Sequence, residues 1–518
     1  NHYPHIENRD DISDYIDKGG MLPILMMTCN RAKLLEITLG SLLSVRGISK
    51  KQIIVSQDGK QSDVANVVKS HGLNLIQNIP ANNKHNKHLR GNYNYLALDG
   101  ASRIAMHYKF SLTHIFNEFP NAPAVIIVED DLLFSPDFLE YFINIAPILD
   151  IDDTTFVISA WNDNGYKGKV DDPYSLSRTE YFPGLGWLLS KRLYKTELES
   201  QWPTSHWDHW LRSFEINKGR EIIFPQVPRT FHNGIKGTFM DLSTHNRYFK
   251  NINYNENNNI KWATHGINNP YSISVASASA SDGGGGSNSA ANTDTKSLPP
   301  VTYAGVPTYI TGTLPVYETR IANLIQDCVH LQNVDELIAS ISQVEIEIEI
   351  DSQKKREQLL QNASILCLWI NVDPDPQYGG SPPFQRISDF FGLWHEHRRG
   401  AHKGLHEFYW EHGKKYILLL NTFNGQMDRQ QHHTSISTST STSAGGSVNT
   451  PYSYTTYLQY KPKDVTFIQP SAFDNNLKLK LMTLHRQELL KGLGSSSSSG
   501  SSSSNGIFVP ALDAGMSC

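Results

Sequence analysis

The sequence predicts an α/β protein built on a mostly parallel sheet with helices on both of its faces. Three observations predict this class. Short apolar runs alternate with segments of helical spacing, the runs end on polar residues, and no run reaches the length of about 18 apolar residues that spans a membrane. Alternating strands and helices favour parallel pairing, because each connection must cross back over the sheet.

The alternation starts at Met21 and continues to the first acidic cluster. The expected strands are Met21–Cys29, Lys51–Gly59, LNLIQN and PAVIIVEDD, and the expected helices are Arg31–Val45, Gln61–Ser70 and His107–Asn117. In parallel sheets, ligands bind beyond the carboxyl ends of the strands. We therefore expect the polar residues at three strand ends, Cys29–Arg31, Gln57–Asp58 and Glu129–Asp131, to converge on one crevice.

Composition excludes some classes of function. The formal net charge is -5, with no dominant basic face, which argues against a nucleic-acid partner. Four cysteines are too few and too scattered for a disulfide scaffold or a zinc cage. One or two disulfides remain possible, and the sequence leaves their pairing open. The acceptor triplet Asn362-Ala363-Ser364 permits a location in the secretory pathway. The chain opens on Asn1 instead of methionine, so we expect a leading segment to be missing.

The acid triplet Glu129-Asp130-Asp131 is the strongest single feature. Adjacent carboxylates repel one another unless a cation or hydrogen-bond donors offset their charge. Hard oxygen ligands suit magnesium or manganese, which can bridge to the phosphates of a nucleotide. The alternative is that these acids only cap the helix that begins near Ser135-Pro136. For an isolated triplet, the two interpretations have even weight.

Four longer motifs decide between them. They are VIIVEDDLLFSPDFLEYF, SAWNDNGY, PGLGWLLSKRLY and WPTSHWDHWLR, in that order. Together they resemble the β-1,2-N-acetylglucosaminyltransferases that act on mannose. That family includes N-acetylglucosaminyltransferase I of N-glycan processing and the protein O-mannose β-1,2-N-acetylglucosaminyltransferase. The similarity runs from Leu22 to Arg247, with a second stretch from Phe390 to Leu420.

The resemblance implies a GT-A (Rossmann-like) fold, UDP-N-acetylglucosamine (UDP-GlcNAc) as donor, Mn²⁺ as cofactor and inversion at the anomeric carbon. It also implies a Golgi-lumenal, type II membrane protein, which contacts the membrane only through a missing N-terminal anchor. Asp131 matches the direct manganese ligand. The donor-binding positions of the family match Arg31, Asp58, His107, Glu129 and Asp130. Without the surrounding motifs, Arg31 would be an ordinary surface residue and His107 an ordinary helix residue.

Asp208 matches the family's catalytic base. An inverting transfer needs a carboxylate that takes the proton from the acceptor hydroxyl, on the face opposite the departing UDP. Three tryptophans surround Asp208 in the sequence and either stack on a sugar or fill the core: Trp202, Trp207 and Trp210. The N-glycan enzyme has a second acid directly after the base, where this chain has His209, so that position is not transferable.

Two further segments resemble the O-mannose enzyme more closely. The loop Arg229–Asp241 is similar to the family loop that closes over the donor, with Gly234 and Gly237 supplying backbone freedom. His232 in this loop is a weak candidate for a phosphate contact. The segment RRGAHKGL is similar to part of the C-terminal subdomain, in which Arg399, Gly400 and Gly404 are assigned no chemistry.

The histidine-rich stretch around His395-Glu396-His397 is a rival metal site. It lacks the helical i, i+4 histidine pair of zinc proteases, because Arg399 stands four residues after His395. We therefore expect a polar turn followed by a strand here, and a zinc hydrolase is the least favoured reading.

Composition and resemblance together predict the domain organisation. Three stretches are low in apolar residues, and we expect them to be flexible inserts: Ser274–Ser297, His433–Thr450 and Ser495–Asn505. The expected divisions are a stem remnant at 1–20, a GT-A catalytic domain at 21–265, a low-complexity linker at 266–300, a smaller C-terminal subdomain at 301–432, an insert at 433–450, the end of that subdomain at 451–494 and a serine-rich tail at 495–518.

The expected function is transfer of N-acetylglucosamine, in β-1,2 linkage, to a mannose of glycoprotein glycans. The acceptor is either the α-1,3-mannose arm of an N-glycan or a protein O-linked mannose, and the sequence leaves both open. The alternative is a catalytically inactive sugar- or UDP-binding protein of the same fold. The presence of the acid triplet and of Asp208 argues against that alternative.

Overall fold

The computed structural model describes residues 11–79, 99–235, 237, 240–262, 308–341, 351–373, 382–410, 414–423 and 454–494. The three expected flexible inserts lie outside these residues. The chain divides into two compact units, Asn1–Phe473 and Asp474–Cys518. The second unit contributes helix α16 (Asn475–Gly494). The described parts of the expected catalytic domain and C-terminal subdomain lie in the first unit, except for residues 474–494 at the end of that subdomain, which lie in the second. The finer domain boundaries stay predictions.

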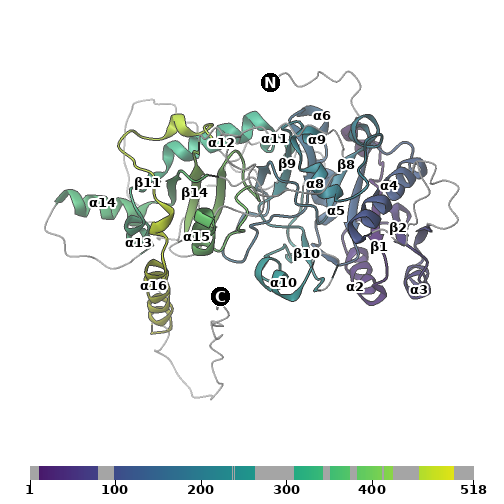
Figure 1. Cartoon of the computed structure of the whole chain (residues 1–518), viewed down its shortest axis with the longest axis horizontal. Coiled ribbons are helices and arrows are strands. Elements are labelled where there is room, and N and C mark those ends of the chain that lie inside the picture. The colour runs from purple at the N-terminus through teal and green to yellow at the C-terminus, as the bar shows by residue number, and fades with distance from the viewer. Residues whose placement is uncertain are drawn as a thin grey trace, which may run out of the picture. The chain divides into compact units, whose positions relative to one another are not determined.

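An eight-stranded sheet organises the first half of the chain (Figure 1). Its strands, in spatial order, are β3 (Asn74–Asn78), β2 (Ile53–Asp58), β1 (Ile24–Thr28), β4 (Ala124–Glu129), β8 (Trp187–Ser190), β6 (Thr155–Ser159), β9 (Glu221–Pro225) and β7 (Leu176–Thr179). The first four strands pair in parallel, as predicted. β8 is antiparallel to β4 and β6, and β7 is antiparallel to β9, so the sheet is mixed. Fully buried strands are continuous apolar runs, which reveal burial but not direction.

Alternate residues of each central strand face two separate apolar cores. On β1, Ile24 and Met26 pack in one core, while Leu25 and Met27 pack in the other. The first core also holds α2 (Ala32–Leu43), α3 (Ser62–Ser70) and α5 (Phe138–Ile145), and the second holds α4 (Gly100–Glu118). Helices therefore cover both faces of the sheet, which confirms the predicted α/β fold class.

A four-stranded sheet forms the core of the C-terminal part of the first unit. Its order is β11 (Val329–His330), β12 (Ile365–Ile370), β14 (Lys415–Asn421) and β13 (Leu405–Trp410). Helix α12 (Leu314–Asp327) packs on it through Tyr317, Ile321 and Ile325. A disulfide joins Cys328 to Cys367, which gives the pairing that the sequence left open.

Short elements complete the described chain. A two-stranded antiparallel ribbon pairs β5 (Leu132–Phe134) with β10 (Thr230–His232). The remaining helical elements are α1 (Ile12–Asp17), η1 (Lys50–Gln52), α6 (Ile148–Ile151), α7 (Lys191–Leu193), η3 (Tyr194–Leu198), α8 (Trp207–Leu211), α9 (Phe214–Asn217), α10 (Leu242–Tyr248), α11 (Thr308–Thr311), α13 (Val334–Ile341), α14 (Asp351–Asn362), α15 (Pro382–Phe391), η4 (Leu458–Tyr460) and η5 (Pro470–Ala472). Among the described helices, none has the length and apolarity that crossing a bilayer requires.

Candidate active site

Three neighbouring parallel strands end at one edge of the large sheet, each on a polar residue. β1 ends on Thr28, β2 on Asp58 and β4 on Glu129. Arg31 directly precedes α2, so the turn from β1 into that helix carries the guanidinium to the same edge. The strand-end residues thus converge at one edge, as expected, and Arg31 contacts both Asp130 and Asp131 there.

Asp130 is a buried carboxylate that is fully engaged by its surroundings. The Thr28 hydroxyl donates to its Oδ2 at 2.6 Å, and Arg31 forms an ion pair with its Oδ1. The Thr38 hydroxyl, on α2, donates to its backbone carbonyl at 2.8 Å. Burial raises the pKa of Asp130, and the Arg31 cation opposes that shift. Asp130 therefore fixes α2 and Arg31 against the end of β4.

Asp131 differs from Asp130 because one of its oxygens is free. Arg31 lies 2.8 Å from Oδ2, and Nε2 of His232 lies 3.5 Å from the same oxygen. Burial works to raise the pKa of Asp131, but His232 and Arg31 outweigh it and the pKa is lowered. Oδ1 is buried and has no hydrogen-bond partner among the described residues.

These properties fit a divalent metal. An ionised carboxylate with one uncommitted oxygen is a hard ligand of the kind that Mn²⁺ and Mg²⁺ take. The backbone leaves little room beside it, because a Cβ added to Gly234 would lie 2.8 Å from Asp131 Oδ2. The residues present therefore fit a metal ion held through Asp131, next to the cationic side chain of Arg31.

Glu129 receives a hydrogen bond that the sequence did not reveal. The Tyr108 hydroxyl, on α4, donates to Glu129 Oε1 at 2.6 Å. Burial and the neighbouring Asp131 carboxylate raise the pKa of Glu129, against the opposing effect of this hydrogen bond. Glu129 is partly exposed, so it can present its second oxygen to a ligand at the edge.

Asp58 lies at the end of strand β2, and His107 packs against the same strand. Asn78 donates to Asp58 Oδ1 at 3.0 Å, and Asp58 is partly exposed at the strand end. His107 is 5% exposed, and its Nε2 lies 2.9 Å from the hydroxyl of Ser56 on the same strand. Burial lowers the pKa of His107 to about 3, so the ring is neutral. Asp58 is thus available to a ligand, while His107 supports the strand from inside. Their contacts to a nucleobase stay predictions.

Asp208 lies on the first turn of α8. Arg212, one turn later, donates to its Oδ2 at 2.7 Å. Burial works to raise the pKa of Asp208, but Arg212 and His209 outweigh it and the pKa is lowered. The carboxylate is 36% exposed, so it is ionised and open to solvent.

An aromatic stack joins Asp208 to the acid triplet. The Trp207 ring lies 4.0 Å from the Tyr108 ring, centroid to centroid, in a stacked arrangement. The hydroxyl of the same tyrosine binds Glu129. Trp202 and Trp187 stack on the outer sides of Trp207 at 6.2 and 5.8 Å. These tryptophans therefore fill the core between the two carboxylate sites, and Trp207 does not present an open face to a sugar.

Sequence reasoning missed Tyr108, Thr28 and Arg212. Tyr108 directly follows His107, and only the three-dimensional turn of α4 shows which of the two faces the triplet. Arg212 was visible, since an Asp and an Arg four residues apart on a helix are neighbours.

The histidine-rich stretch forms the predicted polar turn, followed by β13. His395 Nε2 lies 2.7 Å from Asp389, and His397 is buried. Within the described part of the chain, the one group of three metal-ligating side chains in mutual reach is Cys328, His330 and Cys367, which is elsewhere and contains the disulfide.

The chain is similar in sequence to known proteins. A family model described as GNT-I family matches residues 9–270. The alpha-1,3-mannosyl-glycoprotein 2-beta-N-acetylglucosaminyltransferase of Arabidopsis thaliana is 38% identical over 232 residues, which are 43% of this chain and 50% of that enzyme. The chain thus spans about half the length of the curated relative that it matches.

Two solved structures are similar at a low level. The mannosyltransferase PcManGT from Pyrobaculum calidifontis, in complex with GDP-Man and Mn²⁺, is 16% identical, covers 40% of this chain and 58% of its own, and gives a TM-score of 0.25. S. aureus TarS 1-349, in complex with UDP-GlcNAc, is 13% identical. The match covers 42% of this chain and 60% of that chain, and its TM-score is 0.27.

Proposed function

The chain belongs to the GNT-I family, and on that premise we propose that it transfers N-acetylglucosamine from UDP-GlcNAc to a mannose of a glycoprotein, with inversion. The observation that carries the proposal is a pair of carboxylates of different character, which are linked through Trp207, Tyr108 and Glu129. Asp131 is buried with a free oxygen, and Asp208 is ionised and open to solvent. A sugar- or UDP-binding protein without turnover would have no use for the second carboxylate, Asp208.

Asp131 would hold Mn²⁺ at the diphosphate of the donor. The metal ion, when bound, supplies positive charge that stabilises the departing UDP. Arg31 neutralises Asp130 and Asp131 in the described geometry and lies where a diphosphate would compete for it. Glu129, held by Tyr108, and Asp58 would position the sugar and the nucleoside.

Asp208 would act as the general base. As the mannose 2-hydroxyl attacks C1 of N-acetylglucosamine, its oxygen forms the new C–O bond and its proton passes to Asp208. The bond from C1 to the UDP oxygen breaks, and UDP leaves with that electron pair. Arg212 keeps Asp208 ionised and fixes its orientation through the hydrogen bond to Oδ2.

We propose an α-1,3-mannosyl N-glycan as the acceptor, because the relative from Arabidopsis carries that activity in its name. The O-linked mannose is the competing acceptor, and the histidine-containing loop at His232 is the sequence feature that favours it. The purified protein, given UDP-GlcNAc, Mn²⁺ and each mannoside in turn, should release UDP faster with the preferred one. Absence of acceptor-dependent UDP release with both mannosides would refute the proposed function.

We further propose that the protein works in the lumen of the Golgi as a type II membrane protein. The disulfide Cys328–Cys367 supports an oxidising compartment. Asn362, in the acceptor triplet Asn-Ala-Ser, is exposed at the end of α14, where Lys415 already caps the helix carbonyls. An N-glycan on Asn362 of the native protein, lost in Asn362→Gln, is the expected result. An unglycosylated native protein would count against this location.

A further inference from the structure

The ribbon formed by β5 and β10 carries the metal-site residues at one end and a buried ion pair at the other. His232 pairs with Leu132, and the ladder continues where the Asn233 amide donates to the carbonyl of Asp131 at 2.7 Å. At the far end, the Ser135 amide donates to the carbonyl of Arg229 at 3.0 Å. Three residue pairs therefore separate Arg229 from the site.

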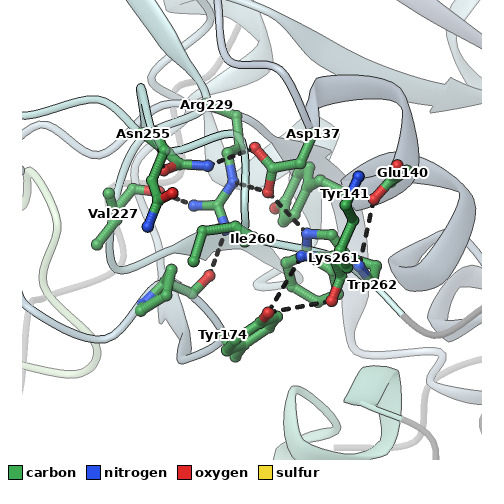
Figure 2. A network of polar contacts seen from close by, with 12 residues as sticks. Asp137, Glu140, Tyr141, Tyr174, Val227, Arg229, Asn255, Ile260, Lys261 and Trp262 are labelled. Atoms are coloured by element: carbon green, nitrogen blue, oxygen red, sulfur yellow. Dashed lines mark hydrogen bonds and ion pairs between the residues drawn. The ribbon is translucent and has the colours of Figure 1, made fainter. Parts of the chain in front are cut away.

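The ion pair between Asp137 and Arg229 has no contact with solvent. Arg229 Nε lies 2.8 Å from Asp137 Oδ2, and both side chains are 0% exposed. The Arg229 guanidinium also donates to the carbonyls of Val227 and Pro173. Its own amide donates to the carbonyl of Ala160, at the end of β6, at 2.7 Å. Figure 2 shows the guanidinium held from several sides.

Two residues from the segment after α10, Asn255 and Trp262, complete the cluster on Asp137. Asn255 donates to Oδ1 at 2.7 Å, and the Trp262 indole donates to Oδ2 at 2.8 Å (Figure 2). Asp137 thus receives bonds to both oxygens, and none of these groups reaches the acid triplet itself. When the hydrogen bonds of a buried ion pair are all formed, the pair constrains the local geometry more than it adds to stability.

We propose that Asp137 and Arg229 are positioning residues for the metal site, with Trp262 and Asn255 as their support. The pair fixes one end of a short ribbon, and the ribbon transmits that position to Asp131 and His232. This inference rests on the proposed function, because it assigns the ribbon a role only if Asp131 holds a metal ion.

A second buried ion pair provides a matched control. Arg178 is 0% exposed, and its guanidinium lies 3.0 Å from Asp152 Oδ2 and 2.7 Å from Glu221 Oε2. Asp152 precedes β6, which runs in the same direction as β4, so it lies at the opposite edge of the sheet from the triplet. Asp152→Asn and Asp137→Asn make the same chemical change at two buried ion pairs.

The test is calorimetric titration of Mn²⁺ into the protein with saturating UDP, alongside thermal unfolding. Both variants should unfold at lower temperature than the wild type. Asp137→Asn should weaken Mn²⁺ affinity by roughly ten- to a hundredfold, the range for groups that orient a metal ligand. Asp152→Asn should leave Mn²⁺ affinity unchanged. If Asp137→Asn is not recovered folded, Trp262→Phe, which removes one hydrogen bond, should shift the affinity in the same direction by a smaller factor.

Equal Mn²⁺ affinity in folded Asp137→Asn and the wild type would overturn the positioning role. If Asp137→Asn does not fold, an unchanged Mn²⁺ affinity in Trp262→Phe would overturn it. An equal loss in Asp152→Asn would also overturn it, because the effect would then be general destabilisation. A wild type that binds UDP without any metal dependence would refute the proposed metal site first, and the positioning role with it.

Discussion

Asp131 and Asp208 owe their different character to their nearest neighbours. Asp131 is buried and keeps one oxygen free beside Arg31 and His232, which stabilise its charge. Asp208 is partly exposed and lies against Arg212. The first environment suits a ligand that must stay ionised, and the second suits a carboxylate that meets an incoming hydroxyl.

Replacing each of these acids by asparagine should separate binding from chemistry. Asp131→Asn should weaken metal-dependent UDP-GlcNAc binding, because it removes a charged ligand. Asp208→Asn should bind donor within a few-fold of the wild type but lose roughly two to four orders of magnitude in turnover, as expected for a lost general base. Donor titration and transfer at saturating donor measure the two effects. Near-normal turnover of Asp208→Asn would place the base elsewhere.

Gly234 should not tolerate a side chain. A Cβ there would lie 2.8 Å from Asp131 Oδ2 and 3.0 Å from its Cβ, so Gly234→Ala must displace the carboxylate. Gly237→Ala is the control, since its Cβ would meet nothing closer than 3.6 Å. We expect Gly234→Ala to weaken Mn²⁺-dependent UDP binding by roughly tenfold or more, as small misplacements of a site do. Calorimetry on both variants checks this, and equal affinities would contradict it.

At the scale of elements, the sequence predicts the first half of the fold well. β1, α2, β2, α3, β3 and β4 all form within the expected segments, while α4 contains the expected helix His107–Asn117 and begins seven residues before it. Pattern does not predict that β8 runs antiparallel, since WLLS is buried on both faces. It also does not predict that Tyr108 instead of His107 reaches Glu129, because that depends on how α4 is rotated against the sheet. Contacts between distant segments carry no local signature.

Tyr108 connects α4, β4 and α8, and its hydroxyl should matter for donor binding. Tyr108→Phe keeps the stack on Trp207 and removes the hydrogen bond to Glu129. A lost hydrogen bond to a charged group costs about 1.5–3 kcal/mol, so donor affinity should fall by roughly tenfold or more. Tyr194→Phe is a matched control. It removes the hydrogen bond between another buried tyrosine hydroxyl and Thr113, which lies on α4 like Tyr108. Equal donor affinities for the two variants would show that donor binding by Glu129 does not depend on its hydrogen bond from Tyr108.

At the scale of the whole molecule, buried polar clusters join the eight-stranded and four-stranded sheets of the first unit. Ser177 on β7 donates to Glu407 on β13 at 2.9 Å, and Arg178 donates to the carbonyl of Gly312 at 2.7 Å. Glu221 on β9 forms an ion pair with His402. These side chains come from segments more than 100 residues apart, so the sequence alone gives no sign of the pairing.

The disulfide should stabilise the C-terminal sheet without taking part in chemistry. It closes a separation of 39 residues, for which the chain-entropy relation gives about 4 kcal/mol. The double variant Cys328→Ala with Cys367→Ala should therefore unfold at clearly lower denaturant concentration, while donor affinity at room temperature stays within a few-fold. Chemical denaturation and donor titration measure these. An unchanged unfolding midpoint would show that the link adds nothing to the native state.

The polar cluster at His402 should contribute less to stability as pH rises. Burial works against a charged His402 ring, but Glu221 and Glu318 outweigh it and the pKa of His402 is raised. Nearby, burial and Glu221 raise the pKa of Glu180 to about 7, against His402, Lys403 and Arg398. Each group keeps its proton in the folded state at a pH where the unfolded chain has lost it.

Because the unfolded state then binds fewer protons at these two groups, their contribution to the free energy of unfolding decreases with pH. The contribution of Glu180 is lost from about its unfolded pKa of 4.3 up to 7, and that of His402 from about 6.5 upward. The stabilisation that these two groups give the wild type should accordingly shrink between about pH 5 and pH 8. Buried His107 and His406, whose pKa is lowered to about 3, act in the opposite direction, so the comparison with variants isolates the effect. The difference in melting temperature between the wild type and Glu180→Gln should narrow in the lower part of this range, and the difference for His402→Gln in the upper part, because each variant removes one titrating group. Melting curves of the wild type and both variants measured across that range decide the matter, and differences that do not narrow as pH rises would show that these two groups do not contribute in this way.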